Sequence, residues 1–286
     1  MSIRCETRGA DLGHTVGSLH IPLTQLTTKY SNTGPVADGS FVPELPSLLL
    51  LHNRFDRSIN VMIGHNGDEG FGYPSLSNDS AFEGTRRQSL DICMVLSSQI
   101  ANRFLGYVDI SFPNAPRAAR QYITEVLYPP EIESAGDLPQ DYSPDQSKSI
   151  IVTGYNNTQG RQALLTSETV INCLTYHVNN AFKGRSYAYL FSAPPALHGQ
   201  ELYYVFYNEQ ATDVFYRPIN VTLAHIVQDY WINFARTGSP NGEGLPQFAQ
   251  WGNDSIVQGL SHAGVWPTPD TTDNARCRWW QLGLYL

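Results

Sequence analysis

Two short signatures, one acidic and one containing histidine, occur in a fixed order along the chain. Glu69 lies in Gly67-Asp68-Glu69-Gly70, and His198 follows much later in His198-Gly199-Gln200-Glu201. A nucleophilic hydroxyl needs an imidazole to take its proton, and the imidazole needs a carboxylate that holds its tautomer and stabilises its charged form. The order of acid and then histidine is the one found after the nucleophile in one large class of such triads. The pair therefore favours the acid and base of nucleophilic acyl transfer.

Each of these residues also has a structural interpretation. Glu69, with Asp68 beside it, could be a solvated loop acid, and a single histidine such as His198 is more often structural than catalytic. Glu201 and Gly199 are interpreted as supporting residues of the histidine loop, although Glu201 is equally well explained as a partly buried structural acid. His65 is the one rival base, because it lies close to Glu69 in the sequence. The two signatures together carry more weight than either alone.

The usual nucleophile has no counterpart in the sequence. The 286 residues contain no Gly-x-Ser-x-Gly elbow and no adjacent glycines of the kind that build an oxyanion loop. Ser261, in Gly259-Leu260-Ser261-His262-Ala263-Gly264, comes close to an elbow. We expect no strand before it and no helix after it, and it follows the histidine, so it is predicted to be a loop serine. No nucleophile is assigned.

Composition limits the class of protein. A hydrophobic fraction of 41% with 12% aromatic residues indicates a folded domain with a substantial core. The formal charge of −8 comes from 26 acids and 18 bases without a block of like charge, which argues against nucleic-acid partners and a polybasic membrane patch. No apolar run is long enough for a membrane span. No cysteine or histidine cluster has metal-ligand spacing, so neither a metal nor a cofactor is expected.

The pattern of apolar residues predicts several elements. A strand is expected over 59–64, which places Glu69 just beyond the carboxyl end of a strand, where sites of α/β proteins lie. Helices are expected over 86–105 and 116–127, and a polar loop over 131–150. Residues 1–45 show no sustained period and are predicted to be irregular.

The second half of the chain is read in the same way. Apolar residues at helical spacing predict a helix that ends at Gly184 and buries Ile171, Leu174, Val178 and Phe182. A buried strand over 187–191 should deliver His198 to a loop. The longest predicted helix spans 220–235 and stops at Gly238. No linker or repeat divides the chain, so one domain that is incomplete at its start is expected over 1–286.

The compartment is indicated only weakly. Glycosylation sequons occur at Asn78, Asn156, Asn220 and Asn253. Chance alone gives roughly two or three sequons in such a sequence. The first residues do not have the pattern of a secretory signal. The four cysteines and the sequons together still favour an extracellular protein.

Four ordered stretches resemble a known family. They are 34–41 (GPVADGSF), 64–70 (GHNGDEG), 191–202 (FSAPPALHGQEL) and 276–280 (RCRWW). Together they resemble type-B carboxylesterases, the cholinesterase-like branch of the α/β-hydrolases, and especially the secreted fungal members. Only residues 1–30 match poorly.

The resemblance implies an α/β-hydrolase fold of which this chain is the C-terminal portion, with the last strands of a mostly parallel sheet and packing helices. Glu69 matches the triad acid and His198 the triad base, whereas the serine belongs to a segment before this chain. Cys173 and Cys277 match a family disulfide. Cys5 matches a cysteine whose partner lies in the absent part, and the state of Cys93 stays open.

The sequence thus predicts the C-terminal half of a serine-type carboxylic ester hydrolase that is inactive as it stands. Its substrate is a small carboxylic ester if the missing half completes the site, and the acyl and alcohol groups cannot be read. The alternative is a non-catalytic cholinesterase-like module for binding or adhesion. The presence of both Glu69 and His198 favours the enzyme.

Overall fold

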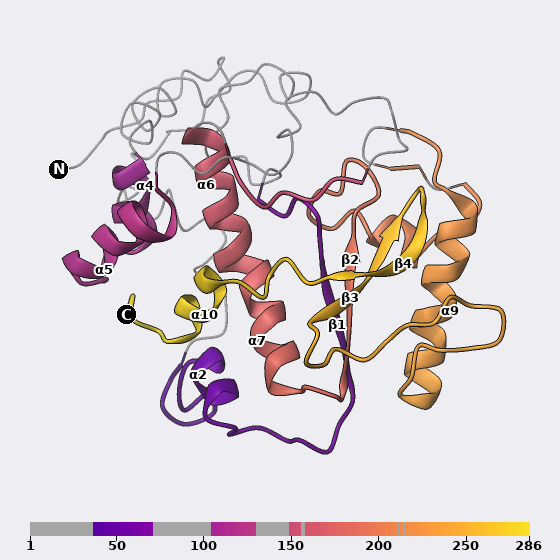
Figure 1. The fold of residues 1–286 in the computed structure, drawn as a ribbon, viewed down its shortest axis with the longest axis horizontal. Coiled ribbons are helices and arrows are strands. Elements are labelled where there is room, and N and C mark those ends of the chain that lie inside the picture. Colours follow the sequence, from indigo (N-terminus) through magenta and orange to yellow (C-terminus); the bar gives the residue numbers. More distant parts are fainter. Residues whose placement is uncertain (1–36, 71–103, 130–148, 156–157, 211, 214–215) are drawn as a thin grey trace, which may run out of the picture. The chain divides into compact units, whose positions relative to one another are not determined.

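The computed structural model describes residues 37–70, 104–129, 149–155, 158–210, 212–213 and 216–286, which are the coloured parts of Figure 1. The chain separates into two compact units. Of the described residues, the smaller contains 104–129 and 285–286, and the larger contains 37–70 and those from 149 to 284. Glu69 and His198 both belong to the larger unit. Most of the predicted polar loop over 131–150 and most of the predicted helix over 86–105 lie outside the described residues.

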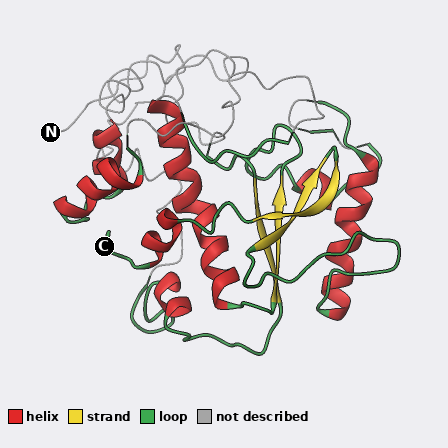
Figure 2. Cartoon of the chain, in the orientation of Figure 1, coloured by secondary structure: helices red, strands yellow, loops and turns green. Residues whose placement is uncertain are grey.

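The larger unit is built on a four-stranded sheet in the order β1-β2-β3-β4, drawn in yellow in Figure 2. The strands are β1 (Val61–Asn66), β2 (Ser186–Phe191), β3 (Ile256–Ser261) and β4 (Gly264–Pro269). The first three are parallel, and β4 is antiparallel to β3. Nearly every residue of β2 is buried, as expected for a parallel strand covered on both faces. The α/β class is confirmed, and both predicted strands are present with shifted ends.

The hairpin formed by β3 and β4 was not predicted. β4 contains Pro267 and Pro269, residues that normally argue against a strand. Among the described residues β4 pairs on one side only, and proline is tolerated there because an edge strand needs only one row of hydrogen bonds.

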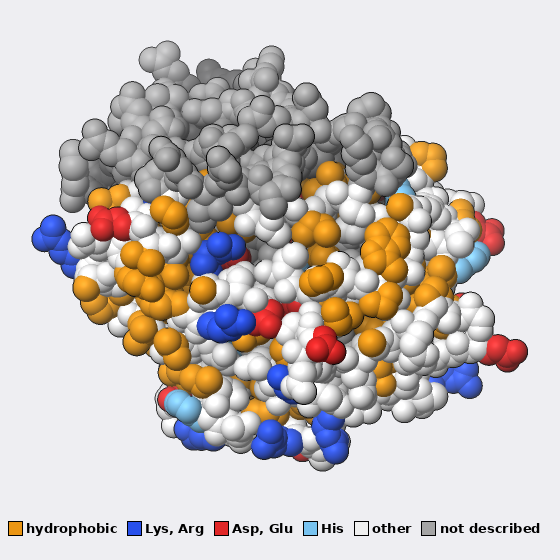
Figure 3. Space-filling model, viewed as in Figure 1, with side chains coloured by type: hydrophobic (Ala, Val, Ile, Leu, Met, Phe, Trp, Pro, Cys, Tyr) orange, Lys and Arg blue, Asp and Glu red, His pale blue; other side chains and the backbone are white. Residues whose placement is uncertain are grey.

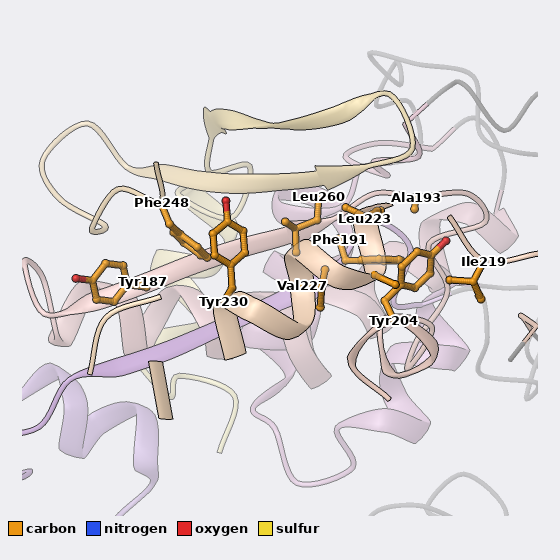
Figure 4. Close-up of a cluster of buried hydrophobic side chains, with 11 residues drawn as sticks. Tyr187, Phe191, Ala193, Tyr204, Ile219, Leu223, Val227, Tyr230, Phe248 and Leu260 are labelled. Atoms are coloured by element: carbon orange, nitrogen blue, oxygen red, sulfur yellow. The ribbon is translucent and has the colours of Figure 1, made fainter. Parts of the chain in front are cut away.

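One face of the sheet is covered by α9 (Val221–Thr237), as Figure 1 shows. The Asn220 side chain caps this helix by accepting a hydrogen bond from Leu223 N at 3.1 Å, and Gly238 ends it in the left-handed conformation. This helix agrees with the prediction to within two residues. Between it and the sheet, together with α8 (Leu202–Val205), lies the aromatic-rich cluster of Figure 4.

The other face carries a long helical segment made of α6 (Thr158–Ser167), the π-helical turn η3 (Glu168–Asn172) and α7 (Cys173–Ala181). Two short helices, α2 (Pro46–Leu51) and α10 (Ala275–Gln281), pack against α7. Helices therefore cover both faces of the sheet in the larger unit (Figure 1).

The predicted buried face of α7 was partly wrong. Leu174 is 47% exposed, whereas Cys173, Tyr176 and His177 are buried. The π-helical turn explains the difference, because its wider turn rotates the residues that follow relative to a regular helix. The Cys173–Cys277 disulfide and a 2.8 Å hydrogen bond from His177 Nε2 to the Cys277 carbonyl hold this rotated face against α10.

The smaller unit contributes three described helical elements: α4 (Phe104–Ser111), α5 (Arg117–Tyr122) and the π-helical η2 (Ile123–Leu127). The last two follow one another without a break and confirm the predicted helix over 116–127. Phe104 and Tyr128 pack with ring centroids 6.2 Å apart.

The described surface carries charges of both signs. On the face shown in Figure 3, basic side chains are scattered and several lie beside acidic ones. Within the described ranges, no helix has both the length and the apolar character needed to cross a bilayer.

Candidate active site

The register of two parallel strands places the candidate acid and the candidate base at one edge of the sheet. Asn66, the last residue of β1, pairs with Phe191, the last residue of β2. Glu69 follows β1 after two residues, and His198 follows β2 on a short loop. Because parallel strands deliver their carboxyl ends to the same edge, residues far apart in the sequence meet there.

Glu69 and His198 contact each other directly. His198 Nδ1 lies 2.6 Å from Glu69 Oε2. The Glu69 side chain is only 4% exposed, whereas that of His198 is 48% exposed. A carboxylate at Nδ1 favours the tautomer with the proton on that nitrogen, so Nε2 is the nitrogen suited to accept a proton. The arrangement supplies an oriented base with a buried acid behind it.

The electrostatics of the site favour a protonated imidazole. The hydrogen bond to Glu69 raises the pKa of His198, burial opposes this, and the charges of Glu69 and Glu201 add to the rise. Burial also raises the pKa of Glu201. The pKa of the Tyr189 phenol is raised by burial and then by the two nearby carboxylates, so Tyr189 is neutral at physiological pH. The raised pKa of His198 means that the site stabilises the positive charge that a general base acquires during catalysis.

Asn66 connects the acid to the histidine loop. Its backbone N–H donates to Glu69 Oε1 at 2.6 Å. Its side-chain Nδ2 donates to the Leu197 carbonyl at 2.8 Å and to Glu201 Oε2 at 2.5 Å. Sequence reasoning did not single out Asn66, because one asparagine at a strand end is an ordinary turn residue. Glu201 was expected to support the loop by hydrogen bonding, and it does contact Asn66.

Further contacts shape the histidine loop. Gln200 is 1% exposed, and it accepts from Leu197 N at 3.1 Å and donates to the Pro194 carbonyl at 3.2 Å. The backbone N–H of Asp68 donates to the Ala196 carbonyl at 2.9 Å, which connects the turn that carries Glu69 to this loop. Gln200 was also missed, because no sequence pattern distinguishes a glutamine that bridges its own loop from a solvated one.

Glycines in the acid signature are required by close backbone approach. A Cβ on Gly67 would lie 1.7 Å from the Ile150 carbonyl oxygen, and one on Gly70 would lie 1.9 Å from the Ala163 carbonyl oxygen. Real Cβ atoms do not come so close to backbone, so any side chain here would displace a neighbouring segment. Gly199 has a different requirement, because its φ of +75° favours glycine while the space around it is open.

The structure also places His65, the rival base, and Ser261, the serine that comes close to an elbow. His65 is buried on β1, and its Nδ1 lies 2.8 Å from the Asn66 carbonyl oxygen, whereas the imidazole in contact with Glu69 is that of His198. The prediction of a loop position for Ser261 was wrong, because Ser261 is the last residue of β3 and 1% exposed. Its hydroxyl accepts from Ser149 Oγ at 2.9 Å and from Ala263 N at 3.3 Å. Nearly every residue of β3 is buried, so the strand shows no alternation of apolar and polar residues, and a hairpin rather than a helix follows it.

The remaining predicted sites are placed as follows. Asn220 caps α9, and Asn253 is exposed in the turn before β3. Asn78, Asn156, Cys5 and Cys93 lie outside the described residues. Cys173 and Cys277 form a disulfide with an S–S distance of 2.02 Å.

Comparison with known proteins identifies the family. The model of the carboxylesterase family matches residues 15–280, which is nearly the whole chain. The chain belongs to the carboxylesterase family. The match to the family begins at residue 15, earlier than the first of the four resembling stretches, which starts at residue 34.

Named relatives of this carboxylesterase-family chain are fungal and animal proteins. It is 29% identical over 249 residues to Carboxylesterase patB of Aspergillus clavatus, covering 87% of this chain and 37% of that protein. It is 28% identical over 217 residues to human Bile salt-activated lipase, covering 72% of this chain and 25% of the lipase. Human Neuroligin-2 is 26% identical over 225 residues, with 75% of this chain and 24% of that protein covered. The chain thus spans well under half the length of these relatives.

The fold agrees with the family. The solved structure of Aspergillus niger EstA superposes with a TM-score of 0.61 at 18% identity, covering 87% of this chain and 44% of EstA. This likeness establishes the fold, which is that of the α/β-hydrolases, as the mixed sheet and its helices on both faces indicate.

Proposed function

We propose that Glu69 and His198 are the acid and the general base of a serine-type carboxylic ester hydrolase, and that the serine is supplied by polypeptide outside these 286 residues. The observation that supports this most strongly is the 2.6 Å contact between a buried carboxylate and a half-exposed imidazole at the carboxyl ends of parallel strands. Membership of the carboxylesterase family supports the same class of reaction.

The proposed chemistry assigns one task to each group. His198 Nε2 removes the proton from the serine hydroxyl as its oxygen attacks the ester carbonyl, and then gives that proton to the departing alcohol. A water molecule, activated by the same imidazole, releases the acid from the acyl-serine. The Glu69 carboxylate holds the ring through Nδ1 and stabilises the imidazolium formed in each step.

The chain by itself is expected to be inactive. Without nucleophile and oxyanion donors, turnover should fall on the order of 10⁶-fold below that of a complete enzyme. The test is to incubate the purified chain with a fluorophosphonate probe and with p-nitrophenyl esters. Serine labelling that abolishes measurable ester turnover would contradict this expectation.

A longer reading frame offers the positive test. The coding DNA upstream of Met1 should contain an in-frame Gly-x-Ser-x-Gly, and the extended protein should hydrolyse p-nitrophenyl esters. In that protein His198→Ala should lower kcat by about 10⁶-fold and Glu69→Gln by about 10⁴-fold. His52→Ala, at a histidine whose side chain is 53% exposed, is the matched control. Full activity in the His198 or Glu69 variant would reject the assigned roles.

A non-catalytic binding or adhesion module is the second candidate. It is kept because Neuroligin-2, whose name is not that of a hydrolase, is among the relatives. An upstream sequence that encodes the elbow with the serine replaced would favour it. The contact between Glu69 and His198 favours the hydrolase, because a module without chemistry has no need of an oriented imidazole.

We also propose an extracellular location, with glycosylation among the four sequons. The Cys173–Cys277 disulfide supports an oxidising compartment. Of the two sequons in the described residues, Asn253 is exposed, whereas Asn220 uses its side-chain oxygen as a helix cap. Mass mapping of the native protein before and after enzymatic deglycosylation tests this, and an unmodified intracellular protein would reject it.

A further inference from the structure

The side chain of Asn66 holds the histidine loop on both sides of His198. Its Nδ2 donates to the carbonyl of Leu197, the residue directly before His198, at 2.8 Å. The same nitrogen donates to Glu201, three residues after His198, at 2.5 Å. Asn66 is fully buried at the end of β1. One amide thus bridges the two flanks of the imidazole to the strand that carries the acid.

The burial of this amide is costly. Within the described part of the chain, Asn66 Oδ1 is buried and has no hydrogen-bond partner. A buried acceptor without a partner costs about 1–3 kcal/mol. The two donated hydrogen bonds offset this cost and are the reason for an asparagine at this position.

The chemistry of the site is specific for asparagine. Leu197 presents a carbonyl and Glu201 a carboxyl oxygen, so the central group must donate twice. An ionised aspartate donates nothing and would repel the nearby carboxylates. A serine hydroxyl donates once, and a glutamine would place its amide one carbon too far from the strand. Only asparagine supplies two N–H donors at this reach.

We propose that Asn66 is a positioning residue that, together with Glu201, clamps the histidine loop so that His198 Nδ1 meets Glu69. The inference rests on the proposed function, because the pair it positions is the acid and base of ester hydrolysis. Asn66 serves both partners: its backbone N–H fixes one oxygen of Glu69, and its side chain fixes the loop that carries the imidazole.

Replacement of the Asn66 side chain should leave the fold intact. The backbone N–H that holds Glu69 is kept in Asn66→Ala. The loop also retains the Asp68 N to Ala196 carbonyl bond and its internal bonds through Gln200. The expected change is therefore in the geometry and occupancy of the Glu69–His198 hydrogen bond, and the sheet should be unaffected.

The experiment is a titration of the His198 imidazole by NMR in the full chain. The parent should titrate above the ordinary value of about 6.5 because Glu69 is hydrogen-bonded to the ring. In Asn66→Ala the pKa should fall towards 6.5. The matched control is Asn241→Ala, which removes two loop bonds to Phe248 of 2.9 and 2.8 Å elsewhere in the unit. It should lower stability while leaving the titration of His198 unchanged.

Two Glu201 variants separate geometry from charge. Glu201→Gln keeps an oxygen that can accept from Asn66 but removes the carboxylate, whereas Glu201→Ala removes both. The clamp requires a larger fall in the His198 pKa for the alanine variant. Equal falls would mean that Glu201 acts through its charge only, and they would overturn its part in the clamp even if Asn66→Ala failed to fold.

The outcomes for the clamp and for the proposed function are distinguishable. Glu69→Gln should abolish the raised pKa. If it does while Asn66→Ala leaves the pKa at the parent value, the clamp is overturned and the acid–base pair stands. If Glu69→Gln leaves the titration unchanged, the pair itself is rejected and the proposed function with it.

Discussion

Removal of the Cys173–Cys277 disulfide should cost the larger unit about 4.7 kcal/mol of stability. The bond joins residues separated by 104 positions, and in the chain-entropy model a loop of about 100 residues restricts the unfolded chain by roughly that amount at 25 °C. All residues of this loop belong to the larger unit. The native contacts around the bond should largely persist, because Arg276 makes a bidentate ion pair with Glu168 that also ties α10 to the long helical segment.

The assay is urea unfolding of the parent and of a Cys173→Ala/Cys277→Ala double variant. Tryptophan fluorescence suits it, because all five tryptophans lie in the larger unit. With an m-value of about 3 kcal/mol/M, the loss corresponds to a midpoint about 1.5 M lower. The parent with the disulfide reduced and alkylated serves as the control and should show a comparable loss.

Two results would refute this reasoning. One is a stability difference below about 1 kcal/mol between the oxidised parent and the double variant. The other is the finding, by peptide mapping without reduction, of both thiols free in protein from an oxidising compartment. The second result would also remove the main support for the proposed extracellular location.

Three further predictions concern Gly67 in the turn that carries Glu69, the cap of helix α9, and the pH dependence of the protein's stability. Gly67→Ala should destabilise the folded protein by about 1–3 kcal/mol or prevent folding, since its Cβ would lie 1.7 Å from a backbone oxygen. Thermal melting measures the loss. The control is Gly252→Ala, which should be tolerated because the nearest atom to its Cβ would lie 3.9 Å away. Asn220→Ala should cost about 1 kcal/mol by removing the cap of α9, and an unchanged urea midpoint would contradict the cap. The raised pKa of His198 implies that its pairing with Glu69 stabilises the protein in full below about pH 6.5 and less as pH rises through the folded-state pKa. The melting temperature of the parent minus that of His198→Gln should therefore decrease between pH 6 and pH 9, and a constant difference would speak against a charged pair.

The sequence by itself indicated the class of fold and singled out Glu69 and His198 as the candidate acid and base. Short apolar runs bounded by glycine and proline predicted β1 and β2, and a helical period with a glycine stop predicted α9. These features are local, since a strand end or a helix cap depends on a few neighbouring residues. The signature around His198 includes a glycine with a local backbone requirement, since Gly199 has a φ of +75°.

Only the tertiary structure decided which groups meet. The partnership of Asn66 with Glu201 and Leu197 depends on the parallel register of β1 and β2, which no local pattern encodes. The buried face of α7 was set by a π-helical turn and by contacts to α10 from a distant part of the chain, so the apolar period gave the wrong face at Leu174. Long-range pairing also determined that Ser261 ends a buried strand. Hydrophobic periodicity reports how a segment folds, whereas the positions of side chains in a site depend on how segments are registered against one another.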